Sequence, residues 1–223
     1  MTASAWVIRR NLISDFIKGD GDRISYGAFA KGGGSDNLFE QNVVICEDRL
    51  RGTPGQRIGL SLGGGGTGKE YCRDGKCITE QSGSTLRANL VASCSDDGIY
   101  LNAAARSTLQ HNTLVDTGGI TVRFPESSAD VQGNLVDGLI RTRDGGLLRL
   151  DDNLDTPAAR LYLGSHPNRA WFRDPLMLDF QWREPVPRRA GRSEALPDLC
   201  GGKRPLQPRY GAFEDFASCM RQP

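Results

Sequence analysis

Histidine and methionine are scarce in this chain of 223 residues, which contains two and three of them respectively. So few histidines exclude a His-rich metal cluster. The sequence also lacks any run near the roughly 18 consecutive apolar residues of a transmembrane helix, so we expect no membrane span. Its net charge is only +1. A protein held to nucleic acid by phosphate neutralisation needs a basic face, so we expect no nucleic-acid partner.

The first residues contain neither a basic stretch nor a long apolar segment, so they do not have the pattern of a secretory leader. We expect either that a leader has been removed or that the chain begins inside a longer precursor. The six cysteines are an even number in loop-rich surroundings, which indicates disulfides and an oxidising compartment. The sequence therefore predicts a secreted or periplasmic protein.

The cysteine positions suggest how these residues pair. The predicted pairs are Cys72 with Cys77, Cys200 with Cys219 and, as a possible third, Cys46 with Cys94. The first pair flanks an Asp-Gly turn, the second contains the only cysteines of the C-terminal part, and the third follows repeated asparagines at similar offsets. Buried free thiols are one alternative. A zinc site is another, although the usual Cys-x-x-Cys spacings are absent.

Proline and charge divide the chain near residue 156. Nine of the eleven prolines lie in residues 157–223, which carry a net charge of +4, whereas residues 1–156 carry −3. Glycine makes up 28 of the 223 residues, against an average near 7%. We predict a repeat domain over residues 1–156 and a Pro/Arg-rich capping segment over residues 157–223.

A short phrase of asparagine followed by leucine or a β-branched residue recurs through the first part. It begins at Asn11, Asn42, Asn89, Asn112, Asn134 and Asn153, in steps of 31, 47, 23, 22 and 19 residues. The longest step contains a Gly- and Cys-rich insertion at residues 63–77. Short alternating stretches such as residues 99–101 and 120–122 follow several of these asparagines. Strands this short cannot bury a core alone, so they must stack on neighbouring copies.

This pattern predicts an all-β fold, a right-handed parallel β-helix of five or six coils. Leucine-rich repeats have a similar period, but their Leu-x-x-Leu-x-Leu framework is missing. Asparagines at one corner can hydrogen-bond from coil to coil, so we interpret them as scaffold. We expect the tail to cover the C-terminal end, because an open stack of strands tends to aggregate. The first residues read as mid-coil, so we expect a missing segment or a partner at the N-terminal end.

The second strands share one alignment frame, in which the first and third residues point inward and the second and fourth outward. The frame aligns residues 28–31, 60–63, 99–102 and 120–123. Its two outward columns are Phe29, Ser61, Tyr100 and Thr121, and Lys31, Gly63, Asn102 and Arg123. Aromatic, hydroxyl, amide and cationic groups on a flat sheet suit an acidic polysaccharide or another glycan. An ordinary solvated face is the alternative.

Three segments resemble a known family. Residues 26–42 (YGAFAKGGGSDNLFEQN), 58–68 (IGLSLGGGGTG) and 170–180 (AWFRDPLMLDF) look like secreted bacterial right-handed β-helix proteins. Among enzymes of this fold, they look like polysaccharide lyases of the chondroitinase-B and alginate-lyase type. The likeness spans roughly residues 5–182 and is more specific for fold than for activity.

The resemblance implies residue roles for β-elimination. Lys31 matches the lysine base of the family, whereas the arginine of the family matches Gly63, which is a departure. Judged by spacing alone, Arg57 and Arg123 are the candidates to replace the arginine of the family. In the family a calcium ion binds the substrate carboxylate and acidifies the neighbouring proton. The family has an acidic pair shortly before the lysine. Here Asp20 and Asp22 lie further upstream, and we interpret them either as calcium ligands or as turn formers.

Other residues carry weaker hypotheses. Asp96 and Asp97 could hydrolyse a glycoside as a carboxylate pair, although neighbouring acids in a turn usually accept backbone hydrogen bonds. His111 is a candidate base or ligand, or an ordinary corner residue. The glycines at 63–68 lack the Gly-Lys-Ser/Thr ending of a phosphate loop. They are better explained as a place where backbone approaches a ligand or where the insertion leaves the coil. The expected functions are therefore an acidic-polysaccharide lyase, a non-catalytic glycan-binding or structural β-helix, and, third, a glycosidase.

Overall fold

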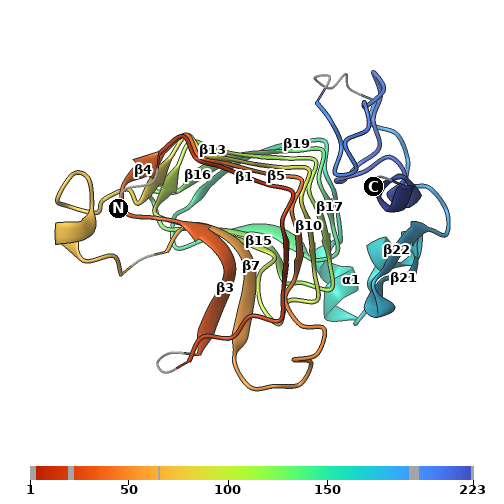
Figure 1. The fold of residues 1–223 in the computed structure, drawn as a ribbon, viewed down its shortest axis with the longest axis horizontal. Coiled ribbons are helices and arrows are strands. Elements are labelled where there is room, and N and C mark those ends of the chain that lie inside the picture. The colour runs from red at the N-terminus through yellow and green to blue at the C-terminus, as the bar shows by residue number, and fades with distance from the viewer. Residues whose placement is uncertain (1–3, 20–22, 65, 191–195, 222–223) are drawn as a thin grey trace.

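The computed structural model describes residues 4–19, 23–64, 66–190 and 196–221, and within them most regular structure is β-strand (Figure 1). The chain passes repeatedly through three parallel sheets, named here sheets A, B and C. Sheet A contains, in spatial order, β1 (Val7–Arg9), β5 (Leu38–Glu40), β9 (Thr85–Arg87), β13 (Ser107–Gln110), β16 (Ser128–Gln132) and β19 (Leu147–Asp151).

Sheets B and C follow sheet A in each coil except the last, which has no strand in sheet C. Sheet B contains β2 (Leu12–Ser14), β6 (Val43–Ile45), β10 (Leu90–Ala92), β14 (Thr113–Val115), β17 (Leu135–Val136) and β20 (Leu154–Asp155). Sheet C contains β3 (Ile24–Ala30), β7 (Gln56–Gly63), β11 (Ile99–Asn102), β15 (Gly119–Arg123) and β18 (Leu139–Arg143). A small fourth sheet pairs β4 (Gly34–Ser35), β8 (Gln81–Ser82) and β12 (Ala104–Ala105). The predicted all-β parallel solenoid is confirmed, because each strand pairs with its counterpart one coil away.

The corner between sheets A and B is built in the same way in every coil. The residue before each repeated asparagine has a positive φ; these residues are Arg10, Gln41, Ala88, His111, Gly133 and Asp152. A left-handed conformation costs a non-glycine residue about 1–2 kcal/mol. The following asparagine stabilises the corner, because its backbone N–H and its Nδ2 both donate to the Oδ1 of the next asparagine. For Asn89 and Asn112 these distances are 3.1 and 2.9 Å.

The repeated asparagines therefore form a continuous hydrogen-bonded ladder from Asn11 to Asn153. Each Nδ2 in the interior also donates to a carbonyl of the preceding coil, as Asn112 does to Leu86 at 2.9 Å. Asn42, Asn89, Asn112 and Asn134 are fully buried. The ladder thus satisfies buried polar groups at a bend where sheet hydrogen bonds are interrupted.

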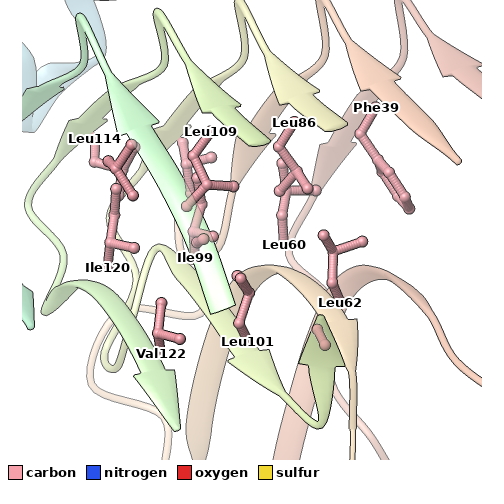
Figure 2. Close-up of a cluster of buried hydrophobic side chains, with 14 of the residues drawn as sticks. Phe39, Leu60, Leu62, Leu86, Ile99, Leu101, Leu109, Leu114, Ile120 and Val122 are labelled. Atoms are coloured by element: carbon pink, nitrogen blue, oxygen red, sulfur yellow. The ribbon is translucent and has the colours of Figure 1, made fainter. Parts of the chain in front are cut away.

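The core consists of inward side chains stacked in columns (Figure 2). Leu60, Ile99 and Ile120 of sheet C form one column, and the other sheet C column is Leu62, Leu101 and Val122. They pack against columns from sheet A that include Leu86 and Leu109. Burying each of these side chains contributes roughly 1.5–3 kcal/mol. The predicted strand frame of sheet C is the register observed in the structure.

Glycines let sheets B and C approach each other. A Cβ added at Gly59 would lie 2.3 Å from Val91 Cγ1 and 2.5 Å from the Gly98 carbonyl oxygen. Gly27 and Gly98 meet Val44 and Leu114 of sheet B in the same way. Three consecutive coils therefore need glycine at this position, since any side chain would push the two sheets apart.

The C-terminal part packs along the side of the solenoid. It contains α1 (Ala158–Tyr162), the antiparallel pair β21 (Phe172–Asp174) and β22 (Asp179–Trp182), and 3-10 turns at Pro167–Trp171, Pro175–Met177 and Phe216–Arg221. A further 3-10 turn, Lys69–Tyr71, lies in the insertion. No helix in the described ranges is long and apolar enough to cross a membrane.

The tail covers the outer face of sheet B, whereas the sequence predicted that it covers the C-terminal end (Figure 1). The reason is that outward residues of sheet B are apolar, among them Leu90, Val115 and Leu135. Phe172 and Phe213 of the tail bury these side chains. The C-terminal coil stays open, since Leu147 and Leu150 are 63% and 55% exposed.

Removing one interior rung of the ladder should destabilise the fold. Asn112→Ala leaves the buried Asn89 N–H without its acceptor and removes the donor to the Leu86 carbonyl. An unsatisfied buried group costs about 1–3 kcal/mol, so we expect a loss of about 3 kcal/mol in urea unfolding. Asn11→Ala at the exposed end is the control and should cost about 1 kcal/mol or less. Equal losses for the two variants would contradict the ladder account.

The glycine column makes an independent prediction. Gly59→Ala should lower the free energy of unfolding by at least about 3 kcal/mol, because its Cβ meets backbone and core atoms that cannot move aside. Gly19→Ala has no atom within 4 Å of the new Cβ and should change stability by no more than about 1 kcal/mol. Thermal or urea unfolding measures both, and a tolerated Gly59→Ala would show that the sheets are not in close contact.

Candidate functional site

A cavity of about 540 Å³ lies beside β3, the edge strand of sheet C. Residues 16–18, which precede β3, line one part of it, and Gly63, Gly64 and Gly66, at and after the end of β7, form what we call the glycine wall. Tyr26 and Phe29 of β3 and Lys31, the residue directly after β3, also line the cavity. A volume of this size accommodates a ligand of one or a few sugar rings.

Two aromatic rings and an ammonium group form the floor of this cavity. Tyr26 and Phe29 meet edge to face, with ring centroids 5.8 Å apart. The Lys31 Nζ lies 5.5 Å from the Phe29 centroid, in a cation–π arrangement. Half of the Phe29 surface is exposed. In the part of the chain that the structure describes, Lys31 takes part in no ion pair within 4.0 Å.

The glycine wall is held in place by a buried carboxylate. Glu80 is 2% exposed and accepts hydrogen bonds from the Thr67 N–H at 3.3 Å and the Thr67 hydroxyl at 3.0 Å. The Cys72–Cys77 disulfide closes the insertion behind this wall. A Cβ added at Gly64 would touch the Lys31 side chain at 3.4 Å, so the wall directly borders the lysine.

Gly63 occupies the position at which the resemblance to lyases implies an arginine. Its φ is +71°, and an added Cβ would lie 1.8 Å from the Asn102 carbonyl oxygen. No larger side chain fits there without moving the backbone. The arginine that the resemblance would place beside Lys31 is therefore sterically excluded from this position.

The two predicted outward columns do share one face of sheet C. Tyr100 pairs with Ser61 and Thr121, and Asn102 pairs with Gly63 and Arg123. Most of this surface is covered, however, since Tyr100 is 8% exposed and Ser61 and Thr121 are 1% and 0% exposed. The Tyr100 ring therefore offers little area on which a sugar could stack.

Arg123 points outward but is engaged by neighbours. Its Nε donates to Asp144 at 2.5 Å, its Nη1 donates to the Tyr100 hydroxyl at 3.4 Å, and its guanidinium lies 4.4 Å from the Phe124 centroid. Lys31 is three strand positions away across β7, β11 and β15, which corresponds to about 14 Å. The structure thus does not bring Arg123 and Lys31 together.

Asp97 belongs to a second polar cluster at the start of β11. Arg141 donates to the Asp97 carboxylate at 3.3 Å and to the Thr121 hydroxyl at 3.0 Å. Burial raises the pKa of Asp97 to about 6, although Thr121 and Arg141 act in the opposite direction. Asp96 adds a smaller raising effect on this pKa through its charge. Asp97 is therefore a buried carboxyl that titrates near neutral pH.

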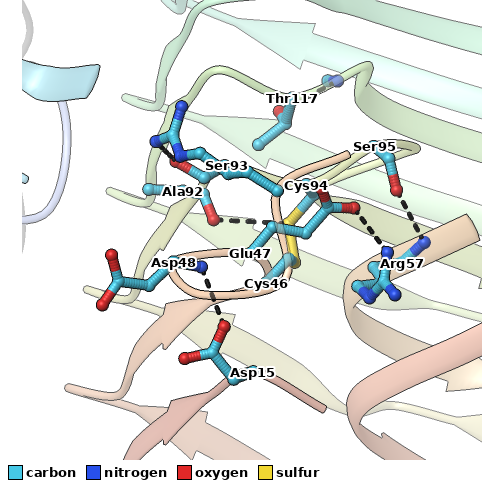
Figure 3. The surroundings of a disulfide bond; sticks show 12 residues. Asp15, Cys46, Glu47, Asp48, Arg57, Ala92, Ser93, Cys94, Ser95 and Thr117 are labelled. Atoms are coloured by element: carbon cyan, nitrogen blue, oxygen red, sulfur yellow. Dashed lines mark hydrogen bonds and ion pairs between the residues drawn. A yellow bond between two sulfur atoms is a disulfide. The ribbon is translucent and has the colours of Figure 1, made fainter. Parts of the chain in front are cut away.

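Arg57 has a structural partner (Figure 3). It is 1% exposed and donates to Glu47 at 2.9 Å and to the Thr53 carbonyl at 3.1 Å. These bonds hold the loop that follows β6 against β7, next to the Cys46–Cys94 disulfide. Arg57 pairs with Ser25 in the sheet, at the far end of β3 from Lys31. It does not reach the Lys31 end of the cavity.

All six cysteines are paired as the sequence suggested. The disulfides are Cys46–Cys94, Cys72–Cys77 and Cys200–Cys219. This pairing leaves no thiol for a zinc site. Three disulfides fit an extracellular protein.

His111 is buried under the tail. It is 4% exposed, and burial together with the charges of Arg204 and Arg189 lowers its pKa to about 3. It therefore stays neutral and is part of the corner.

Asp20 and Asp22 lie outside the described residues. Among the residues that are described, no group of three or more His, Cys, Asp or Glu side chains gathers to hold a metal.

Sequence reasoning missed part of the cavity. Lys18 precedes β3 in an irregular segment that carries no periodic signal. Its backbone N–H donates a hydrogen bond to the Ser25 hydroxyl at 2.8 Å. Tyr26 was also missed; it lies three residues before Phe29 in the same strand, and the two rings are in contact. In the separate Asp97 cluster, Arg141 was also missed, although it follows Thr121 in the same outward column.

No family model, curated protein or solved structure matches this chain. The resemblance to polysaccharide lyases stays a prediction from the sequence. Function is inferred from the chemistry of the cavity.

The Asp97 environment predicts how stability depends on pH. Its folded pKa of about 6 exceeds the ordinary value of 3.8, so the folded state binds more protons and stability falls as pH rises from about 4 to about 6. At about 1.4 kcal/mol for each pKa unit, Asp97→Asn should gain about 2–3 kcal/mol over the wild type at pH 7. The gain should vanish near pH 4. Urea unfolding at both pH values tests this. The same stability difference between Asp97→Asn and the wild type at pH 4 and pH 7 would contradict it.

Proposed function

We propose that this protein is a secreted, right-handed parallel β-helix that binds an acidic polysaccharide in the cavity beside β3. The observation that carries the proposal is Lys31 placed over Phe29, next to Tyr26, in a cavity of about 540 Å³. Right-handed winding follows the strong preference of parallel crossover connections. The three disulfides support export to the cell exterior or the periplasm.

The cavity groups match the chemistry of an anionic sugar. The exposed face of Phe29 can stack on the apolar C–H face of a pyranose ring, as aromatic platforms do with flat ligands. The ammonium groups of Lys31 and Lys18 suit a uronate carboxylate or a sulfate. The glycine wall lets backbone groups approach the sugar hydroxyls closely.

Binding without elimination is favoured because neither the arginine that the resemblance implies nor either of its two substitutes lies beside Lys31. Gly63 has no room for an arginine, Arg57 is paired with Glu47, and Arg123 is about 14 Å away. Elimination needs groups that stabilise the developing enolate beside the base.

A lyase is the second candidate, because Tyr26 and Lys31 line the same cavity. Lys31 could remove the proton next to the uronate carboxylate, and Tyr26 could protonate the leaving oxygen. Any Ca²⁺ would then have to neutralise the substrate carboxylate. Glycoside hydrolysis by Asp96 or Asp97 has less support. A pair of catalytic carboxyl groups stands about 5–9 Å apart across the substrate, and Asp97 faces Thr121 and Arg141.

A polysaccharide panel tests both candidates in one experiment. The wild type should bind uronate-containing or sulfated chains, and Lys31→Ala should weaken binding at least tenfold because it removes the ammonium over Phe29. Lys203→Ala, an exposed lysine of the tail, is the matched control and should bind normally. The loss should shrink at high salt, since surface charges are screened.

Ultraviolet absorbance of unsaturated uronate, recorded with and without Ca²⁺, separates binding from elimination. Absorbance that depends on Lys31 and Tyr26 would establish the lyase. Binding without absorbance supports the binding protein. Normal binding by Lys31→Ala would refute the cavity as the glycan site.

A further inference from the structure

Both ends of the solenoid expose unpaired strand edges. At the N-terminal end, β1, β2 and β3 each have a sheet neighbour on one side only among the residues that the structure describes. Trp6, Val7 and Leu12 there are 59%, 56% and 73% exposed. At the other end β18, β19 and β20 are the edge strands. Open edges of this kind are templates for pairing with another chain.

The asparagine ladder gives these two ends opposite hydrogen-bonding character. Each rung donates its N–H and Nδ2 to the Oδ1 of the rung one coil further along the chain. Asn11 therefore ends the ladder with an Oδ1 that accepts from no residue in the described part. Asn153 ends it with a backbone N–H that has no acceptor there, while its Nδ2 donates to the Val131 carbonyl.

Side chains at the two ends are complementary in the same register. If a second copy continued sheet A, Leu150 would lie on Ile8 and Asp151 on Arg9, as the existing columns align. The side chains of Asp151 and Arg9 are 66% and 48% exposed. In sheet B, Leu154 would lie on Leu12. The charged pair is of opposite sign and the apolar pairs are of similar size.

We propose that copies of this chain associate head to tail, with the C-terminal coil of one copy docking on the N-terminal coil of the next. At the corner, Asn153 would donate to Asn11 of the second copy as every interior rung does. Sheets A and B continue across the junction, whereas sheet C ends one coil earlier with β18 and leaves a gap of one strand. Because the contact is heterologous, it produces open chains of copies and not a closed dimer.

One residue weakens the junction. Asp155 occupies the inward column of sheet B, where earlier coils have Val136, Leu114 and Val91. In the stacked pair it would face Ile13, so its carboxylate would lose solvent. Inward charges on terminal strands limit edge-to-edge association. Association should therefore be weak and should strengthen when this charge is removed.

Sedimentation velocity of the full chain between about 5 and 500 μM tests the proposal. The average sedimentation coefficient should rise with concentration and pass that of a dimer. Asn11→Ala and Asn153→Ala should each weaken association at least fivefold, and Asp155→Leu should strengthen it at least tenfold. Unfolding measurements on the same variants show whether each one is folded. A wild type and an Asp155→Leu variant that both stay monomeric would overturn the proposal.

A mixing experiment tests the orientation. Leu12→Lys blocks the N-terminal end and Leu150→Lys blocks the C-terminal end, both at exposed positions. Each variant alone should be monomeric, and an equimolar mixture should form a dimer that grows no further. Dimers formed by Leu150→Lys alone would indicate contact between two N-terminal ends and would contradict the head-to-tail arrangement. A mixture that stays monomeric would do the same.

Discussion

The hydrogen bond from one asparagine to the next fixes where every coil turns from sheet A into sheet B. The bend requires a residue with positive φ followed by buried polar backbone, and neither is stable alone. The ladder satisfies that backbone and sets the register of sheet B, because each strand of that sheet begins one residue after its rung. The inward columns of leucine, isoleucine and valine can stack only when this register holds.

The candidate site follows from two places where the coils differ. The strands β3 and β7 are longer than the later strands of sheet C and extend beyond the body of the solenoid (Figure 1). The insertion after β7 returns past Lys31 and is fixed there by Glu80 and a disulfide. A wall and a floor therefore meet at the edge strand, whereas the regular part of the same face is filled by its own ion pairs.

Much of the scaffold could be predicted, because a solenoid repeats its physical requirements in sequence. The asparagine spacing, the inward and outward columns and the cysteine pairs all follow from local patterns. The position of the tail could not be predicted in this way. It depends on the apolar outer face of sheet B, and strands of two or three residues are too short to show from sequence that both of their faces are apolar. Arg57 and Lys18 could not be placed either. Their environments are set by loops, where charge and spacing do not determine which partner a side chain meets.

Amide hydrogen exchange, measured by NMR residue by residue, tests the ladder most directly. The account predicts that the backbone N–H groups of Asn89 and Asn112 exchange only through large-scale opening, because each is buried and bound to the next asparagine side chain. The N–H of Asn11 at the exposed end should exchange much faster. Exchange at Asn89 and Asn112 as rapid as in exposed loops would contradict the account, since the coils would then be held by packing alone.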